Sequence, residues 1–180
     1  MEYVADGHYK KESFKDYLAR GDNVSVFEPG DMNEEDFFQK PPYALDRTQV
    51  PAQRPLAVFF EQGECHACDI LHAQPLQKKA IHQLFNEFDS VQIDRWADTP
   101  ILTPGGKATT AREWADKLNI FYTPTLIFFD ERGNEIIRVD SVVHFFRLRN
   151  VLNFIVNKGY LVEPNYQRWR ATQNLIGRTR

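Results

Sequence analysis

A short apolar run that leads directly into a pair of cysteines constrains the fold of this chain more than any other feature of its sequence. Residues 56–62 (LAVFFEQ) form the run, and Gly63 ends it. A continuous apolar run of this length is typical of a strand that is buried on both faces of a sheet. Residues 67–88 then follow a helical pattern. We expect an interruption at Pro75, because proline removes a hydrogen bond from a helix interior.

The chain beyond this point alternates between strands and helices. We predict further strands at residues 91–93, 125–129 and 135–139, and helices at residues 110–118 and 145–158. Thr110 and Glu113 have the spacing of a capping box at the start of the first of these helices, and Gly159 is expected to end the second. A turn at residues 104–106 (PGG) indicates a hairpin within an insert at about residues 95–110. The predicted order from residue 56 is therefore β-α-β-(insert)-α-β-β-α.

Two segments flank the predicted domain, which would span residues 55–160. Residues 1–54 are expected to form a polar, irregular N-terminal extension, with one amphipathic helix at residues 10–20 and a short helical turn at residues 33–39. Residues 161–180 are expected to form a helical C-terminal tail.

Composition excludes several classes of protein. A hydrophobic share of 42% and an aromatic share of 13% are typical of a globular chain. A run of about 18 apolar residues, which a membrane span requires, is absent from the sequence. The net charge of −3 predicts no basic face, so we expect no nucleic-acid partner.

The cysteine content points to redox chemistry. The whole chain has two cysteines, Cys65 and Cys68, which lie three residues apart. A small secreted domain held by disulfides would have several cysteines spread along its loops, and a structural zinc site would need further ligands at a similar spacing. One isolated C-x-x-C pair is instead the arrangement of a reversible disulfide, and we expect no bound metal.

The position of the pair where a strand turns into a helix assigns different roles to its members. Cys65 would lie at the helix N-terminus, where free N–H groups and the helix dipole stabilise a thiolate and lower the pKa of the thiol. Cys65 is therefore predicted to attack, and Cys68 to resolve the mixed disulfide. His66 lies between them and, when protonated, would stabilise the thiolate and make the pair more oxidising. The alternative is that His66 is a solvated loop residue with little influence.

A second motif, residues 122–125 (YTPT), directly precedes a later apolar strand. With this motif and the C-x-x-C pair, the chain resembles the thioredoxin superfamily over about residues 55–160, and within it the bacterial periplasmic thioredoxins of the SoxW or thioredoxin-2 type. The resemblance is carried by the segments FFEQGECHACDILH, DTPILTPGGKATTAREWADKLNI and YTPTLIFFDERGNEI. It implies a three-layer α/β fold with a central mixed sheet. It also implies that Pro124 is cis and faces the disulfide, and that the backbone of Thr123 pairs with the substrate chain.

The sequence departs from cytoplasmic thioredoxins at two buried positions. Their aspartate six residues before the first cysteine corresponds to Phe59, and Ser90 is nearest to their lysine on the next strand. The usual acceptor for the proton of Cys68 is therefore absent. Glu61 or Glu64 could replace it, and Glu64 reads more readily as an exposed carboxylate.

These observations predict a thiol–disulfide oxidoreductase that reduces or exchanges protein disulfides, with the cysteine pair as redox centre and no bound cofactor. A DsbA-like oxidase or isomerase and a binding module with a structural disulfide remain alternatives. A metallochaperone is a third, in which Cys65, Cys68, His72 and another histidine would bind Zn2+. We expect a monomer.

The N-terminus lacks the apolar stretch of a signal peptide, which allows two locations. We expect a mature periplasmic chain without its leader, since the resemblance is to exported thioredoxins and implies a DsbD-like membrane electron donor. A cytoplasmic protein is the alternative.

Overall fold

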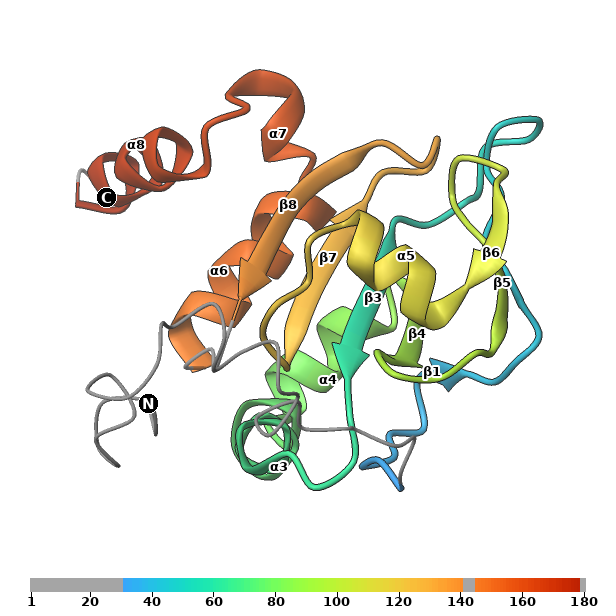
Figure 1. Cartoon of the computed structure of the whole chain (residues 1–180). Coiled ribbons are helices and arrows are strands. Elements are labelled where there is room, and N and C mark those ends of the chain that lie inside the picture. Colours follow the sequence, from blue (N-terminus) through green and yellow to red (C-terminus); the bar gives the residue numbers. More distant parts are fainter. Residues whose placement is uncertain (1–30, 141–144, 179–180) are drawn as a thin grey trace, which may run out of the picture.

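The computed structural model describes residues 31–140 and 145–178 of the 180-residue chain. Its centre is a five-stranded sheet in the order β1-β4-β3-β7-β8 (Figure 1). The strands in that order are β1 (Phe38–Gln39), β4 (Asp89–Asp94), β3 (Leu56–Glu61), β7 (Thr125–Phe129) and β8 (Glu135–Asp140). The sheet is mixed, because β1, β4 and β3 are parallel whereas β7 is antiparallel to both β3 and β8.

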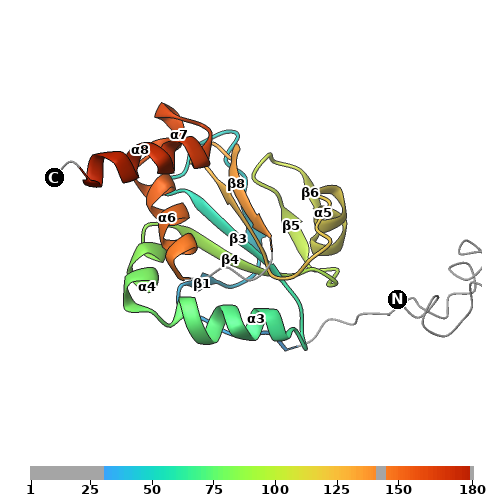
Figure 2. The ribbon, with the colours of Figure 1, turned by 90° about the vertical axis from the view of Figure 1, so that its left-hand side faces the viewer.

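Helices cover both faces of this sheet, as Figure 2 shows. One face carries α3 (His66–Leu71), the π-helical turn η2 (His72–Leu76), α4 (Lys79–Phe85) and α6 (Phe145–Val156). The other carries α5 (Ala111–Lys117) and a small sheet of β2 (Tyr43–Ala44), β5 (Pro100–Leu102) and β6 (Ala108–Thr110). The predicted three-layer α/β architecture is confirmed.

The central strand β3 shows why the apolar run forms this fold. All six of its residues are buried, and their side chains alternate between the two faces. Ala57 and Phe59 pack in the core under α3, α4 and α6, whereas Leu56, Val58 and Phe60 pack in the core under α5. By the same alternation, the side chain of Glu61 lies on the same face of the sheet as Phe59. This face is covered by α3, the helix that begins at the cysteine pair.

The predicted interruption of the helix after the cysteines is confirmed. Pro75 lies inside η2, between α3 and α4, and the next helix begins only at Lys79. Because proline has no N–H to donate, the chain takes a wider turn there.

The hairpin in the insert and the start of α5 agree with prediction. Strands β5 and β6 are antiparallel, and β5 also pairs with β2. The hydroxyl of Thr110 accepts a hydrogen bond from the Glu113 N–H at 3.3 Å and so caps α5. The Glu113 carboxylate accepts from the Thr109 hydroxyl at 2.7 Å.

Two local predictions are wrong. Residues 33–39 do not form a helical turn, because Phe38 is buried and pairs with Ser90 as part of β1. Gly159 does not end α6. Lys158 takes the left-handed conformation there (φ 52°), and Gly159 begins α7 (Gly159–Val162). The predicted helix at residues 10–20 lies outside the described residues.

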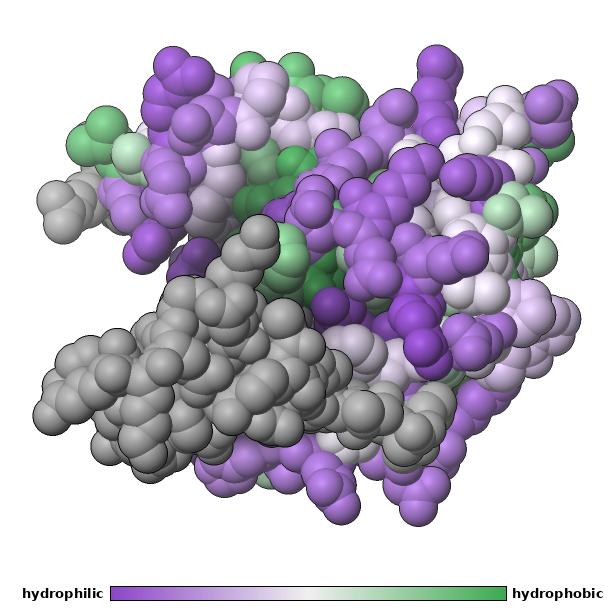
Figure 3. Space-filling view, in the orientation of Figure 1, coloured by the Kyte–Doolittle hydropathy of each residue, from purple (hydrophilic) through white to green (hydrophobic). Residues whose placement is uncertain are grey.

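The C-terminal tail is helical, with α7 followed by α8 (Tyr166–Arg178). Trp169 of α8 packs on Phe154 of α6, with ring centroids 5.1 Å apart. On the face seen in Figure 3 hydrophilic side chains dominate, and hydrophobic ones are visible between these helices and the central sheet. None of the helices within residues 31–140 and 145–178 is long and apolar enough to cross a membrane.

Candidate active site

The two cysteines form a disulfide at the start of α3. Cys65 is the N-cap of this helix, and its Sγ accepts a hydrogen bond from the Cys68 N–H at 3.1 Å. Cys65 is 8% exposed and Cys68 is 1% exposed, so both residues are buried, Cys65 less completely than Cys68. The predicted position of Cys65 at the helix N-terminus agrees with the structure, and the attacking and resolving roles of the two cysteines stay predictions.

The order of the sheet brings the second motif to the same place. Strand β3 is antiparallel to β7, and Phe60 near the end of β3 is the register partner of Thr125 at the start of β7. The residues that follow β3 and those that precede β7 therefore share one edge of the sheet. The hydroxyl oxygen of Thr123 lies 3.6 Å from Cys65 Sγ, and the Thr123–Pro124 peptide bond is cis.

An exposed aromatic pair precedes this bond. Phe121 and Tyr122 are both largely exposed, and the Thr125 hydroxyl donates to the Tyr122 carbonyl at 2.7 Å, which holds the loop. His66, the first residue of α3, is exposed. Its tuning role stays a prediction.

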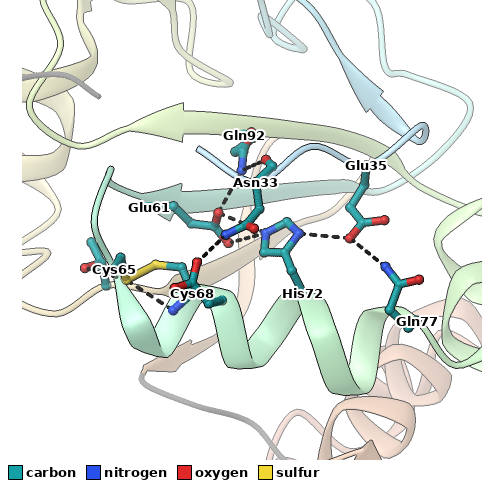
Figure 4. A network of polar contacts seen from close by, with 10 residues as sticks. Asn33, Glu35, Glu61, Cys65, Cys68, His72, Gln77 and Gln92 are labelled. Atoms are coloured by element: carbon teal, nitrogen blue, oxygen red, sulfur yellow. Dashed lines mark hydrogen bonds and ion pairs between the residues drawn. A yellow bond between two sulfur atoms is a disulfide. The ribbon is translucent and has the colours of Figure 1, made fainter. Parts of the chain in front are cut away.

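A buried histidine lies between two carboxylates on the inner side of the same helix (Figure 4). His72 is four residues after Cys68, and the backbone N–H of His72 donates to the Cys68 carbonyl oxygen. The side chains of the two residues therefore share one face of the helix. Its Nε2 is 3.0 Å from Glu61 Oε2, and its Nδ1 is 2.9 Å from Glu35 Oε1. Glu61 is 0% exposed and His72 is 4% exposed.

Amide side chains complete this cluster. The Gln92 amide nitrogen donates to Glu61 Oε2 and to the Asn33 carbonyl, both at 2.7 Å. The Asn33 amide in turn donates to Asp69 Oδ1 at 2.9 Å. Burial alone would lower the pKa of His72, but the hydrogen bonds and negative charges of Glu61 and Glu35 outweigh it and raise that pKa.

His72 is thus neither a helix-surface residue nor turned towards a metal site with the cysteines. Within residues 31–140 and 145–178, no group of three or more His, Cys, Asp or Glu side chains is arranged to hold a metal ion. The signal in the sequence was Glu61, since a carboxylate at the end of a fully buried strand requires a charged or hydrogen-bonding partner.

The two positions at which cytoplasmic thioredoxins carry a charge are apolar or neutral here. Phe59 is wholly buried among aromatic rings, with Phe38 at a centroid distance of 4.9 Å. The buried Ser90 hydroxyl has no hydrogen-bond partner among the described residues. Glu61 is the buried carboxylate nearest in the chain to the cysteines, and Glu64, with φ 50°, is exposed.

Comparison with known proteins assigns the family. The profile of the thioredoxin-like domain matches residues 43–155, which is well over half of the chain. The chain belongs to the thioredoxin-like family. No curated protein sequence matches it. A C-x-x-C disulfide at this position of a thioredoxin-like fold supports thiol–disulfide redox activity in general.

Solved structures resemble this chain at low sequence identity. A thioredoxin-fold protein from Helicobacter pylori is 17% identical with a TM-score of 0.61, over 76% of this chain and 89% of that one. A thioredoxin from Thermus thermophilus is 18% identical with a TM-score of 0.47, over 59% and 76% of the two chains. The oxidised C-terminal domain of DsbD from Neisseria meningitidis is 18% identical with a TM-score of 0.45, over 57% and 80%. The first of these likenesses shows the thioredoxin-like fold.

Proposed function

We propose that the protein is a thiol–disulfide oxidoreductase that reduces or exchanges disulfide bonds in other proteins. The observation that carries the proposal is the position of Cys65. Its sulfur lies at the start of α3, beside Thr123, at an edge where Phe121 and Tyr122 are exposed. A structural disulfide needs neither a helix start nor an exposed aromatic loop beside it.

The reaction transfers two electrons. In the reduced protein the Cys65 thiolate attacks one sulfur of a substrate disulfide, and the other substrate sulfur leaves and takes up a proton. Cys68 then loses its proton, and its thiolate attacks Cys65 Sγ. The second substrate sulfur leaves and is protonated, so that the substrate ends as a dithiol and the Cys65–Cys68 disulfide has formed.

Glu61 is proposed as the acceptor of the Cys68 proton. It is the last residue of β3, points to the side of α3, and contacts His72 on the helix face that Cys68 shares. Its wholly buried carboxylate takes the place of the missing aspartate. Glu61→Gln should slow the attack of Cys68 on Cys65 Sγ at neutral pH by about 100-fold, whereas Glu64→Gln, three residues after the end of the same strand, should behave as the wild type. Equal rates in the two variants would remove Glu61 from this role.

Substrate binding is proposed for the loop before β7. Main-chain groups at Thr123 and Pro124 would pair with an extended substrate segment. The exposed rings of Phe121 and Tyr122 would contact apolar residues beside the substrate disulfide. Replacing both rings with alanine should raise KM for a protein disulfide and leave the rate with a small aliphatic disulfide unchanged.

Reduction of insulin disulfides tests the proposal as a whole. We expect activity in the wild type and none in Cys65→Ser, while Cys68→Ser should accumulate a mixed disulfide with its substrate. Full activity in Cys65→Ser would refute the proposal. The reduction potential of the Cys65–Cys68 pair then gives the direction of net electron transfer. A value of about −270 mV favours a reductase, and a value of about −120 mV favours an oxidase.

The working location proposed is the periplasm, with a DsbD-like membrane protein as electron donor. The support is the likeness of the insert at residues 95–110 and of the Thr123–Pro124 motif to exported thioredoxins. Fractionation of cells that express the natural gene tests it. Recovery of the protein in the cytosolic fraction would contradict this location without affecting the redox chemistry.

A further inference from the structure

His72 has carboxylate oxygens at both of its ring nitrogens. Nδ1 is 2.9 Å from Glu35 Oε1, and Nε2 is 3.0 Å from Glu61 Oε2. A neutral imidazole has one N–H and can donate to only one of them, whereas the imidazolium donates to both. The geometry therefore favours a charged ring between two ionised carboxylates.

The three charges come from three separate elements. Glu61 ends β3, His72 follows α3, and Glu35 lies in residues 31–37, before β1. The other titratable groups around the ring have partners of their own. Asp69 on α3 accepts from Asn33, and Asp94, the register partner of Glu61 on β4, accepts from the Trp96 N–H. On α4, His82 pairs with Asp36 at 2.8 Å, and on its own helix His72 has Cys68 one turn away.

The segment that carries Glu35 is anchored by packing. Phe37 stacks on Phe85 with ring centroids 4.9 Å apart, and Phe38 is buried against Phe59. Glu35 is therefore held in place by neighbours that do not depend on its charge. It also lies outside residues 43–155, the part of the chain that matches the family.

We propose that Glu35 is a positioning residue of the redox centre, which keeps His72 doubly protonated and turned towards Glu61. The proposal rests on the function above, in which Glu61 takes the proton of Cys68. The imidazolium donates to the Glu61 carboxylate that takes the proton of Cys68 and so holds it in place. Glu35 keeps that imidazolium from losing its own proton, because an opposite charge nearby favours the charged form. When Glu61 accepts the proton of Cys68, the net charge of the three groups changes from −1 to zero, and the negative charge passes to the Cys68 thiolate that attacks Cys65 Sγ.

The test compares Glu35→Gln with Glu34→Gln. Glu34 precedes Glu35 and carries the same charge, but it is exposed and pairs with Lys40. NMR titration of the His72 ring in the oxidised protein should give a midpoint about 1–3 pH units lower in Glu35→Gln than in the wild type. Glu34→Gln should leave the midpoint unchanged. An unchanged midpoint in Glu35→Gln would overturn the proposal.

A kinetic measurement separates positioning from mere packing. Cys65 is loaded with thionitrobenzoate as a mixed disulfide, and release of the coloured thiol reports the attack of Cys68. We expect release at pH 7 to be about tenfold slower in Glu35→Gln, with the rise of the pH profile displaced to higher pH. A profile that overlays the wild type would overturn the proposal.

Two further controls keep these results interpretable. If Glu35→Gln does not fold, His72→Gln, which keeps hydrogen-bonding groups but not the charge, should give the same displaced profile, and a wild-type profile would overturn the proposal. If the wild type itself releases no thiol, the proposed function fails and the inference with it. The His72 titration then still reports the contact with Glu35, so the two failures are distinguishable.

Discussion

The hydroxyl oxygen of Thr123 lies 3.6 Å from Cys65 Sγ, although 58 residues separate them in the chain. With the disulfide formed, the hydroxyl is the donor in this contact. In the reduced protein the same hydroxyl can donate to the Cys65 thiolate, and a hydrogen bond to the charged form lowers the pKa of the thiol.

Thr123→Val should therefore raise the pKa of Cys65. We expect alkylation of Cys65 in the reduced protein at pH 6 to slow by about two- to tenfold, the range that corresponds to a net hydrogen bond of about 0.5–1.5 kcal/mol. Thr109→Val, which removes a hydroxyl that donates to the Glu113 carboxylate instead, is the control and should leave the rate unchanged. Mass spectrometry should find Cys65 labelled before Cys68, and the reverse order would contradict the assignment of the attacking thiol.

His72 should make stability depend on pH. Its pKa is raised in the folded protein, so its contribution is fully present below its unfolded pKa and is lost as the pH rises through the folded pKa. Denaturant titrations at a series of pH values should show this loss in the wild type and in the control His66→Gln, whose ring is exposed. His72→Gln should lack it, and an identical pH dependence in all three proteins would show that His72 is not its source.

Arg47 should matter far more for stability than a surface arginine. It is 5% exposed, and its guanidinium donates to Asp89 Oδ2 at 2.9 Å and to the carbonyl oxygens of Arg54 and Asp130. Arg47→Met leaves these acceptors without their donor and should lower the free energy of unfolding by about 3 kcal/mol or more. Arg168→Met, which removes an exposed partner of Glu163, should cost less than about 1 kcal/mol. Similar midpoints in denaturant for the two variants would contradict the structural reading of Arg47.

Gly159 should tolerate no side chain. A Cβ there would lie 2.5 Å from Trp169 Nε1 and 2.8 Å from Phe154 Cδ2. Gly159→Ala should destabilise the protein by about 1–3 kcal/mol, because the tail must move away from α6. Gly105→Ala, where a Cβ meets no atom within 4 Å, is the matched control. A Gly159→Ala variant as stable as the control would mean that α8 packs differently.

The regular part of the fold was predictable because its signals are local. The run at residues 56–62, the interruption at Pro75 and the turn at residues 104–106 each identify an element from its own residues. The C-x-x-C pair directly after the apolar run likewise predicts a helix start at Cys65, which the structure confirms. Strand β1 could not be found this way, because two residues show no periodicity and Phe38 is extended only through pairing with β4.

The charged cluster of Glu61, His72 and Glu35 could be predicted only in part from the sequence. Glu61 stands out in its apolar strand, and the sequence alone makes it a candidate proton acceptor. Its contacts depend on residues that are distant in the chain. His72 lies 11 residues after Glu61, and Glu35 lies 37 residues before His72. On a single helix His72 reads as a surface residue, whereas in the fold it is 4% exposed and contacts Glu61 of β3 and Glu35.

Strand β1 also decides how this protein can be shortened. It supplies hydrogen bonds to β4, and no further strand of the described chain lies beyond it in the sheet. A fragment that begins at residue 43, where the family match starts, would leave the backbone N–H and C=O groups of β4 open along the sheet edge. Such an edge is a template for pairing with another copy, so the fragment should self-associate, whereas chains that retain residues 31–42 should remain dispersed.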